Sequence, residues 1–522
     1  MNEGTRRGRG KKGRAALLFL LCYLAALALL TLSERHAEGA SIRSLGDALW
    51  YSLVTMTTVG YGDLAPVTLP GRIIGLLFLG MSVSLFGLLL HGIYALMTGR
   101  LVPWLRLSLG KSRTWYLFDR AEEETCLLAE NLLAGDGDAL AVFCGTGALP
   151  RREPRFCATE KPVRAMAEYA ERKGIRCILF AEGGGADAGE GLPAGLRVIR
   201  RKDPEMPGGA GEIFDPIASA ARQYWKDHPV RPREREILLV GDGIWARELL
   251  NRAILNNGRV PFQTTVYRVF GDWADYQRNH SRLGTALALN RLEEGRDSLF
   301  FEKGPWNEEE RIRAADRIIL CGEDREANRR KAGTLLTWFP AKAEIHLLGD
   351  AAAEGVICFG SMRPVLTPEN VLRDEMNRLA RAMNEHYRRR YGGPAWEELD
   401  EFTKELNRAA ADHLFVKARL LAGDGPMEED ERFRIALERF RTADQALREK
   451  CRRNEHDRWM RFYCLYNWRQ GEKKDPVLRT HPCIAPFEAL SAEDQEKDEG
   501  AWELMEIVLR REGGTDGEDG TK

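Results

Sequence analysis

The chain has 522 residues, enough for three or four domains of ordinary size. Lys plus Arg number 77 and Asp plus Glu number 78, which gives a formal net charge of −1, and apolar residues make up 44% of the chain. This composition excludes collagen, a disulfide miniprotein and a wholly disordered chain, and the balanced charge argues against duplex nucleic acid as a partner. The ten cysteines form no CxxC pair, so we expect neither a metal site nor disulfides.

Two apolar stretches near the N-terminus predict membrane-spanning helices. The first, residues 15–32, is 18 residues long without a charge and follows a basic segment, residues 1–14. Taken alone, it also fits a cleaved signal peptide. The second, residues 73–97, has no Asp, Glu, Lys or Arg and favours two spans. The positive-inside rule then places both termini in the cytoplasm, so we expect a multi-pass protein of the cell membrane, in contact with the lipid bilayer.

The most informative run of the sequence lies between these stretches and reads TMTTVGYGD, residues 55–63. Glycine adopts a positive φ without steric cost, so the alternating glycines of this run allow successive carbonyls to face one axis. A ring of such carbonyls replaces the hydration shell of K⁺, which is the permeant ion that we expect. The predicted filter residues are Thr58, Val59, Gly60, Tyr61 and Gly62. One loop supplies only a quarter of a ring, which predicts a homotetramer.

Residues 15–100 resemble the two-helix bacterial potassium channels, through the TVGYG signature, the Asp that follows it and the aromatic approach ALWYS. The resemblance implies an α-helical, two-span pore domain with a pore helix and filter over residues 44–63. It assigns support of the filter to Trp50, Thr57 and Asp63, and the gate or hinge to Ser82, which replaces the family's usual glycine, or to Gly87.

After the pore, short apolar strands alternate with helical stretches, a pattern typical of parallel βαβ sheets. We expect a first Rossmann-like domain over residues 112–230 and a second over residues 235–366, with the Pro- and Gly-rich segment 183–211 forming surface loops. The predicted strands are 115–118, 139–144 and 175–180 in the first domain, and 236–240, 264–270, 315–320 and 343–348 in the second.

The second of these domains carries a glycine-rich turn, GDGIWA at residues 241–246, between a strand and a helix. Gly241 would form the tight turn, Gly243 would let a phosphate approach the helix N-terminus, and Ala246 completes the GxGxxA pattern. Asp272, two residues after the next strand, is the candidate ribose contact. The pattern predicts either a nucleotide site or a turn retained for close packing of the helix on the strand.

Two tandem Rossmann-like domains behind a two-span pore resemble the RCK and TrkA-type domains of ligand-gated potassium channels. The resemblance implies that a cytosolic ligand controls the pore, and a nucleotide is the first candidate. In the first domain the loop after the strand, residues 119–124, has four acids and no glycine, so it should repel phosphate. These carboxylates make Ca²⁺ the second candidate.

The C-terminal third of the sequence is mainly helical. We expect a connector over residues 367–433, with Thr367 as N-cap and Pro368 at the first position of a helix that runs to about residue 390, and a disordered tail over residues 511–522. Residues 434–510 resemble the RyR repeat domain, a small helical module. Its motif residues are His456, Arg458, Trp459, Trp468, Gly471, Asp475, His481, Pro482, Pro486, Leu490, Lys497 and Asp498.

Aromatic and cationic side chains of this RyR-like domain form a second candidate ligand site, because rings stack on a base and cations hold a phosphate. The residues of this candidate site are His456, Arg458, Trp459, Trp468, Arg469 and His481. Helical spacing also places some of these aromatic side chains in the core of the domain itself.

The sequence therefore favours a potassium-selective channel gated by a cytosolic, nucleotide-type ligand that the RCK-like and RyR-like domains bind. A membrane-tethered, NAD-dependent enzyme is one alternative, but the chain shows no catalytic pair, P-loop lysine or metal-ligand set, so we expect no enzyme. A subunit of a K⁺ uptake transporter is the other; such chains usually carry four pore loops, and this sequence has one.

Overall fold

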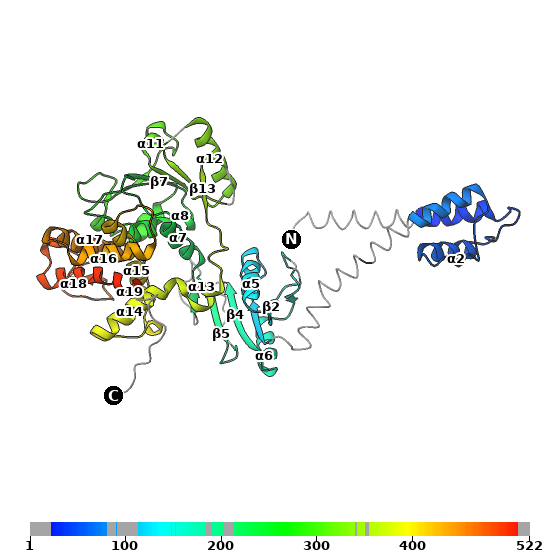
Figure 1. Ribbon diagram of the computed structural model, residues 1–522, viewed down its shortest axis with the longest axis horizontal. Coiled ribbons are helices and arrows are strands. Elements are labelled where there is room, and N and C mark those ends of the chain that lie inside the picture. Colours follow the sequence, from blue (N-terminus) through cyan, green and yellow to red (C-terminus); the bar gives the residue numbers. More distant parts are fainter. Residues whose placement is uncertain are drawn as a thin grey trace. The chain divides into compact units, whose positions relative to one another are not determined.

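The computed structural model describes residues 22–80, 90, 113–147, 149–151, 153–182, 191–202, 212–339, 342–349 and 354–509. They fall into two compact units, Met1–Arg113 with Arg151–Ala158, and Thr114–Pro150 with Thr159–Lys522, and each is described by itself. Figure 1 follows the elements along the chain, from the pore helices in blue to the C-terminal helices in red. The predicted basic segment and tail lie outside the described residues.

Three helices form the pore unit: residues 22–34, α2 (Leu45–Met56) and residues 69–80. They pack around a small apolar core made of Leu27, Leu30, Ile42, Ala48, Ile74 and Phe78. The two predicted spans extend beyond the described residues, and within the described part no helix has both the length and the apolarity to cross a membrane.

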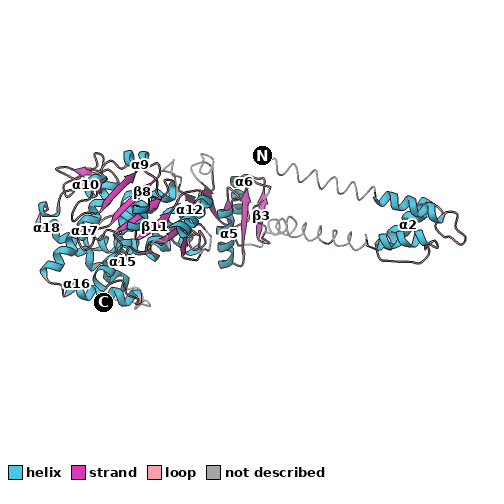
Figure 2. Cartoon of the chain, turned by 90° about the horizontal axis from the view of Figure 1, so that it is seen from above, coloured by secondary structure: helices cyan, strands magenta, loops and turns pink. Residues whose placement is uncertain are grey.

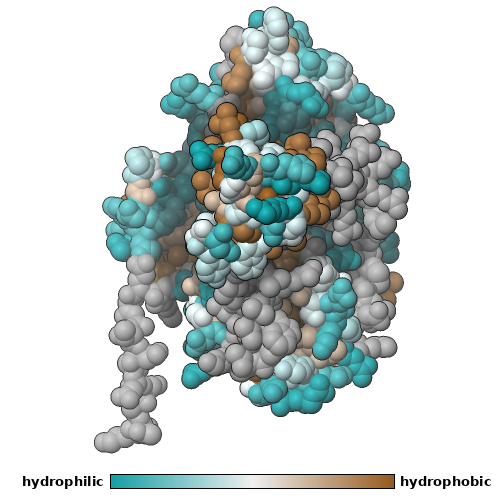
Figure 3. All heavy atoms as spheres, turned by 90° about the vertical axis from the view of Figure 1, so that its right-hand side faces the viewer, coloured by the Kyte–Doolittle hydropathy of each residue, from teal (hydrophilic) through white to brown (hydrophobic). Residues whose placement is uncertain are grey.

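The surface of the pore unit is unusually apolar. Most of the large hydrophobic side chains that the described residues expose lie between residues 24 and 90. Figure 3 shows hydrophobic side chains, in brown, exposed together on one face. An apolar surface of this kind requires a lipid or protein neighbour.

A buried carboxylate ties the end of the first helix of the pore unit to the segment after residues 58–62. Glu34 is 0% exposed and accepts hydrogen bonds from the backbone N–H of Val67 (3.0 Å), the backbone N–H of Thr68 (2.9 Å) and the Thr68 hydroxyl (2.6 Å). A Cβ at Gly71 would lie 2.1 Å from Glu34 Oε1, so any larger residue there would displace the carboxylate.

The first sheet has six strands in the order β3-β2-β1-β4-β5-β6, which is the order of a doubly wound nucleotide-binding fold. The strands are β1 (Thr114–Phe118), β2 (Ala139–Cys144), β3 (Phe156–Thr159), β4 (Arg176–Glu182), β5 (Arg197–Arg201) and β6 (Glu212–Phe214). Its helices are α5 (Glu123–Gly135), α6 (Val163–Arg172) and α7 (Pro216–Asp227). The three predicted strands are confirmed, and the second has the predicted bounds.

One prediction for this sheet is wrong. The segment 183–211, expected to form loops, contains β5, which pairs in parallel with β4 and β6. The sequence of β5, RVIRR, places three arginines in five residues, so it lacks the apolar run that marks a buried strand. A strand near the edge of a sheet tolerates these charges because its side chains reach solvent.

The second sheet has the order β13-β12-β11-β7-β8-β10-β9, again the doubly wound order, with β9 added at one edge. Its strands are β7 (Glu236–Val240), β8 (Val266–Phe270), β9 (Ala288–Leu289), β10 (Ser298–Glu302), β11 (Arg317–Leu320), β12 (Glu344–Leu348) and β13 (Val356–Phe359). Its helices are α8 (Ile244–Asn256), α9 (Ala274–Asn279), α10 (Leu283–Ala286), α11 (Glu309–Ala314) and α12 (Arg325–Trp338). Figure 2 shows helices covering these strands. The two predicted Rossmann-like sheets are therefore confirmed.

The C-terminal part of the chain is helical, as predicted. It contains α13 (Pro368–Arg373), η3 (Glu375–Asn377), α14 (Arg378–Tyr391), η4 (Trp396–Glu398), α15 (Glu401–Ala422), α16 (Glu429–Arg441), α17 (Gln445–Leu465), β14 (Arg469–Gln470), β15 (Thr480–His481), η5 (Phe487–Ala489), α18 (Ala492–Glu503) and α19 (Met505–Leu509). Thr367 caps α13 by accepting the N–H of Asn370 at 3.2 Å. The helix predicted to reach residue 390 is interrupted at Asp374, whose φ is 54°.

Buried ion pairs join α17 to the second sheet and to α15. α8 contacts both α15 and α17. Arg461 on α17 is 0% exposed and donates to Asp297 Oδ2 at 2.7 Å, while Asp297 Oδ1 accepts the N–H of Thr265 at 2.6 Å. Lys417 on α15 pairs with Glu455 on α17 at 2.8 Å. Since a buried charge without its partner is costly, the first pair fixes α17 on the second sheet and the second pair fixes α15 against α17.

Arg461→Ala should lower the free energy of unfolding of the second compact unit by about 3–5 kcal/mol, because it leaves Asp297 buried and without its counter-charge. The control is Arg164→Ala, which removes an exposed i,i+4 pair with Glu168 and should cost less than about 1 kcal/mol. Urea denaturation of the full chain in detergent, followed by tryptophan fluorescence, measures both. Equal stability of the two variants would contradict the role given to Arg461.

A buried histidine makes this helical core sensitive to acid. Burial, together with the charge of Lys417, lowers the pKa of His413 to about 3, and its Nε2 lies 2.8 Å from Gly258 O. The unfolded chain, with an ordinary histidine pKa near 6.5, binds more protons than the folded chain between these values. The contribution of His413 is therefore complete above pH 6.5 and declines as the pH falls, by about 1.4 kcal/mol per unit.

His413→Gln should reduce this acid sensitivity. Between pH 7.5 and pH 5 the wild-type chain should lose about 2 kcal/mol more stability than the variant, measured by urea denaturation at each pH. The same loss in both chains would show that His413 is not the group that titrates.

Candidate functional site

The loop that follows the pore helix has a positive φ angle at every second residue. α2 begins where predicted, because the Ser44 hydroxyl accepts the N–H of Asp47 at 3.1 Å and the Asp47 carboxylate accepts the N–H of Ser44 at 2.8 Å. Beyond the end of α2, the φ angles of Thr58, Gly60 and Gly62 are 59°, 57° and 73°. In an ordinary strand successive carbonyls alternate in direction, so a positive φ at every second residue turns them to the same side.

Trp50 on α2 braces this loop from the side. Its ring stacks on that of Tyr61 with centroids 6.2 Å apart and planes 3° apart, and its Nε1 donates to Asp63 Oδ2 at 2.9 Å. The hydroxyl of Thr57 donates to Leu53 O at 2.7 Å and closes the last turn of the helix. The structure thus brings Trp50 and Asp63 together beside the loop and places Thr57 at its base. Ser82 and Gly87, the predicted hinge residues, lie outside the described residues.

The glycine turn of the second sheet is forced by close packing. Gly241 has a φ of 152°, and a Cβ there would lie 2.6 Å from the backbone nitrogen of Gly322. Ala246 is completely buried on α8. Both observations fit a turn that holds α8 tightly against the strands.

The N-terminus of α8, where a phosphate was expected, is occupied by a side chain of the same chain. Gly243 is the N-cap of α8, and the backbone N–H of Ile244 donates to Glu323 Oε1 at 3.0 Å. A Cβ at Gly243 would lie 2.3 Å from the same carboxylate oxygen. Since a carboxylate at a helix N-terminus makes the contacts that a bound anion would make, Glu323 competes directly with a phosphate.

The cleft around this turn, about 500 Å³, is acidic. Its lining includes Asp242, Glu323 and Asp324 against one lysine, Lys331. Asp272 is exposed at the carboxyl end of β8, and its backbone N–H donates to Asp242 Oδ2 at 2.6 Å. The structure therefore gathers Gly241, Gly243 and Asp272 at one sheet edge, but in surroundings that disfavour phosphate.

The acidic loop of the first sheet makes ion pairs and hydrogen bonds within the protein. Asp119 accepts the N–H of Glu182 at 3.0 Å, and Arg201 pairs with Glu124 at 2.7 Å and with Glu182 at 3.4 Å. Burial raises the pKa of Asp119 above its ordinary value, against the hydrogen bond from Glu182. In the described part of the chain no group of three or more His, Cys, Asp or Glu side chains is arranged to hold a metal ion.

Three candidate residues of the RyR-like domain belong to its core. Arg458 is 3% exposed and donates from Nη2 to Glu455 Oε1 at 2.6 Å. His456 is buried, with Nε2 2.8 Å from Ala485 O, and Trp468 is buried against Phe402 with ring centroids 5.4 Å apart. These side chains hold the domain together and offer no free face to a ligand.

The other three candidates are less buried. Trp459 and His481 are half-buried, with ring centroids 4.8 Å apart, and both contact Tyr463. Burial, together with nearby Lys474, lowers the pKa of His481 to about 4, so the imidazole is neutral at physiological pH. Arg469 is exposed on β14. Four of the six candidates are aromatic rings, and the structure brings three of these together, since the ring of His456 also lies 6.0 Å from that of Trp459.

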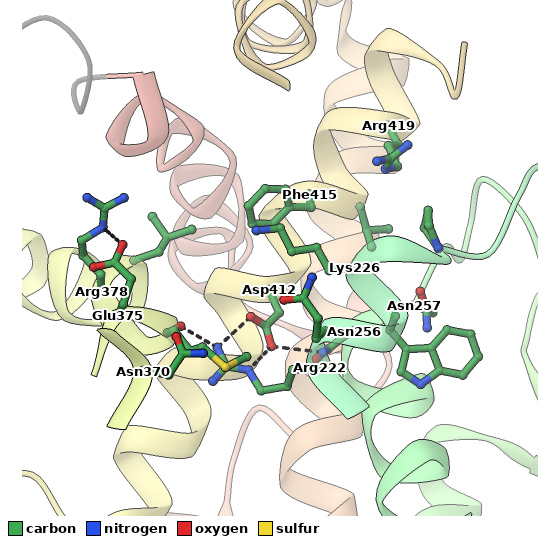
Figure 4. A pocket seen from close by; sticks show the side chains of 16 residues that line it. Arg222, Lys226, Asn256, Asn257, Asn370, Glu375, Arg378, Asp412, Phe415 and Arg419 are labelled. Atoms are coloured by element: carbon green, nitrogen blue, oxygen red, sulfur yellow. Dashed lines mark hydrogen bonds and ion pairs between the residues drawn. The ribbon is translucent and has the colours of Figure 1, made fainter. Parts of the chain in front are cut away.

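Sequence reasoning missed a cavity of about 280 Å³ between helices of the second compact unit (Figure 4). Its lining includes Arg222 and Lys226 from α7, Asn256 from α8, and Asp412 and Phe415 from α15. These residues are as much as 193 positions apart in the sequence and form no local motif. Only the packing of α7, α8 and α15 brings them together, so no signal in the sequence marks this cavity.

Comparisons with known proteins support the two resemblances. Residues 16–98 match the family model described as "Ion channel", and residues 438–510 match that described as "RyR domain". A 43-residue stretch, 8% of this chain and 7% of the relative, is 49% identical to the potassium voltage-gated channel subfamily A member 5 of Mus musculus. A 57-residue stretch, 11% of this chain and 19% of the relative, is 47% identical to the voltage-gated potassium channel of Aeropyrum pernix.

Among solved structures, the GsuK channel bound to ADP is 16% identical, with 69% of this chain and 97% of that chain covered and a TM-score of 0.31. The curated relatives above are matched over only 7–19% of their own length, all of it in short stretches. The family models and the potassium-channel relatives confirm that the N-terminal segment resembles potassium-channel pores, and the second family model confirms that the C-terminal segment resembles the RyR domain.

Glu323→Ala should create affinity for a dinucleotide at the N-terminus of α8, because it frees the N–H of Ile244 and removes one negative charge. We expect NAD⁺ to bind the variant at least tenfold more tightly than the wild-type chain, measured by calorimetry on the full chain in detergent. The control is Glu326→Ala, which removes an exposed acid paired with Arg329. Wild-type affinity in the Glu323 variant would contradict the competition described above.

Proposed function

We propose that four copies of this chain form a potassium-selective channel in the cell membrane, and that the cytosolic part opens or closes the pore in response to a nucleotide-type ligand. The observation that carries the proposal is the pore loop, where φ is positive at residues 58, 60 and 62 on a sequence of TVGYG type. Carbonyls turned to one side can replace the hydration shell of an ion only when several rows surround a shared axis. One chain supplies one such row, so several copies are needed. Both termini would be cytoplasmic.

The apolar surface of the pore unit supports a place among lipids and neighbouring copies. Trp50 stacks on Tyr61 and donates a hydrogen bond to Asp63, and these contacts support a filter of fixed width. A channel needs no catalytic group, which is consistent with the proposal that this chain is not an enzyme.

The energy required for control by a ligand is modest when four chains share it. A shift from 1% to 99% open requires a ligand to favour the open state by about 5.5 kcal/mol, which is less than about 1.5 kcal/mol per site in a tetramer. The tandem doubly wound sheets and the RyR-like domain are the parts of the chain that would bind the ligand and move. The alternative of an NAD-dependent enzyme is weakened by Glu323, which lies where the pyrophosphate of NAD would be held.

Gly60→Ala should abolish the preference for K⁺ over Na⁺. A Cβ at this glycine meets no atom within 4 Å, so the effect arises from its φ of 57°, a conformation that costs an L-residue roughly 1–2 kcal/mol. Relaxation of this strain would rotate the carbonyls away from the ion. Liposomes loaded with the full chain, assayed for K⁺ and Na⁺ flux, measure the selectivity.

The matched control for this test is Gly46→Ala in the pore helix, where a Cβ makes only an ordinary contact, 3.5 Å from Ser44 Oγ. It should leave selectivity intact. Normal discrimination between K⁺ and Na⁺ in the Gly60 variant would overturn the filter assignment, and an absence of K⁺ flux in the wild-type chain both with and without added nucleotides would overturn the channel.

A further inference from the structure

The cavity between α7, α8 and α15 contains two buried side-chain amides with unused hydrogen-bonding groups. Asn256 is 4% exposed; its Nδ2 donates to Asp412 Oδ2 at 3.2 Å, while its Oδ1 has no hydrogen-bond partner among the described residues. Asn257 is 2% exposed, and its Nδ2 likewise has no partner within the described part of the chain. Both residues line the cavity. Buried polar groups are nearly always hydrogen-bonded, so these two imply a bound group that supplies one donor and one acceptor.

Of the charged side chains that line this cavity, only Lys226 has no ion pair among the described residues; Arg378 pairs with Glu375 at 2.7 Å and Arg419 with Glu429 at 2.9 Å. Four cationic side chains line the cavity, against two carboxylates; they are Arg222, Lys226, Arg378 and Arg419, and the carboxylates are Glu375 and Asp412. Arg222 is held by Asp412, through Nε at 2.7 Å and Nη2 at 2.9 Å. Lys226 lies over the ring of Phe415, 4.7 Å from its centroid, and makes no ion pair with any described residue. An anionic ligand would therefore find a cation that the protein does not neutralise.

Three properties of the site define the chemistry of its ligand: an unused donor and acceptor, a ring face, and a free cation. Figure 4 shows Lys226 and Phe415 side by side above Asp412 and Asn256, with Asn257 to one side. The adenine edge combines an amino donor with a ring-nitrogen acceptor, which matches Asn256 Oδ1 and Asn257 Nδ2. Guanine and hypoxanthine present the reverse polarity at this edge.

We propose that this cavity binds an adenine mononucleotide, with its base read by Asn256 and Asn257, its ring against Phe415 and its phosphate near Lys226. This proposal rests on the function proposed above and names the site and class of the ligand. The volume of about 280 Å³ lies at the lower limit of small-molecule sites, roughly 300 Å³, so a dinucleotide is too large. The site is distinct from the glycine turn, where Glu323 opposes phosphate.

The position of the site explains how a ligand in it would reach the rest of the molecule. α7 follows the last strand of the first sheet, α8 follows the first strand of the second sheet, and α15 belongs to the helical connector. α7 contacts α8, and α8 contacts α15. A ligand that binds one arrangement of these helices more tightly than another shifts the population between them.

Calorimetry on the full chain in detergent tests the proposal, with AMP, IMP, ribose 5-phosphate and inorganic phosphate as probes. We expect AMP to bind at least tenfold more tightly than each of the other three. Equal affinities for AMP and IMP would overturn the reading of the base, and equal affinities for AMP and inorganic phosphate would reduce the site to one for simple anions and overturn the proposal. Absence of AMP binding would do the same.

Two variants locate the binding. Lys226→Gln should weaken AMP binding at least tenfold, and Asn257→Ala should reduce the preference for AMP over IMP at least fivefold, because it removes a donor that the folded chain does not use. The matched control is Lys173→Gln, which changes another lysine over an aromatic ring, 5.9 Å from the centroid of Tyr169. Unchanged AMP binding in both cavity variants would overturn the site.

Flux measurements separate this site from the channel itself. In liposomes, AMP should change the K⁺ flux of the wild-type chain at least twofold and leave that of Lys226→Gln unchanged. K⁺-selective flux without AMP binding would overturn the site and leave the channel standing. AMP binding without any K⁺ flux would overturn the channel and leave the site standing.

Discussion

The pore depends on one constraint, the direction of successive backbone carbonyls. A polypeptide extended with all its φ angles negative alternates its carbonyls, and no choice of side chains changes this. Only a reversal of handedness at every second residue aligns them, and here Thr58 joins the two glycines in the left-handed region. The surrounding residues hold this backbone in place. The loop begins directly after α2, and Trp50 hydrogen-bonds to Asp63 at its side. Glu34 accepts a hydrogen bond from the N–H of Val67 and so joins the segment after the loop to the first helix.

Features encoded within a few neighbouring residues were predictable from the sequence. The capped start of α2 is local, and its N-cap stands where the sequence predicts it. The strands 139–144 and 236–240 contain runs of apolar residues, and their predicted bounds are those of the structure. The sequence does not predict β3, β5, β6, β9, β10 or β13. β5 is rich in arginine and the others have only two to five residues, so they carry little periodic signal. Glu323, which opposes a phosphate, is 79 positions from its partner Ile244, so no motif connects them.

In the RyR-like domain, charged residues are a poor guide to a ligand site because several of them are buried. In α17 the charged side chains Glu455, Arg458 and Arg461 are all buried, each in an ion pair or hydrogen bond with a residue of its own or another element. A helix with charges on its buried face has little amphipathic character, so its orientation cannot be read from hydrophobic periodicity. The cationic residues that the sequence suggested for a ligand are therefore partly structural, and the cavity lined by Asn256 and Lys226 lies elsewhere in the fold.

The carboxylate of Glu323 at the N-terminus of α8 has a consequence for the maturation of the protein. In a doubly wound domain built around a cofactor, the helix N-terminus is completed only when the cofactor arrives. Here the chain completes it with its own side chain, since the N–H of Ile244 is already satisfied. The second sheet can therefore reach its finished form during synthesis, whatever the cellular supply of dinucleotide.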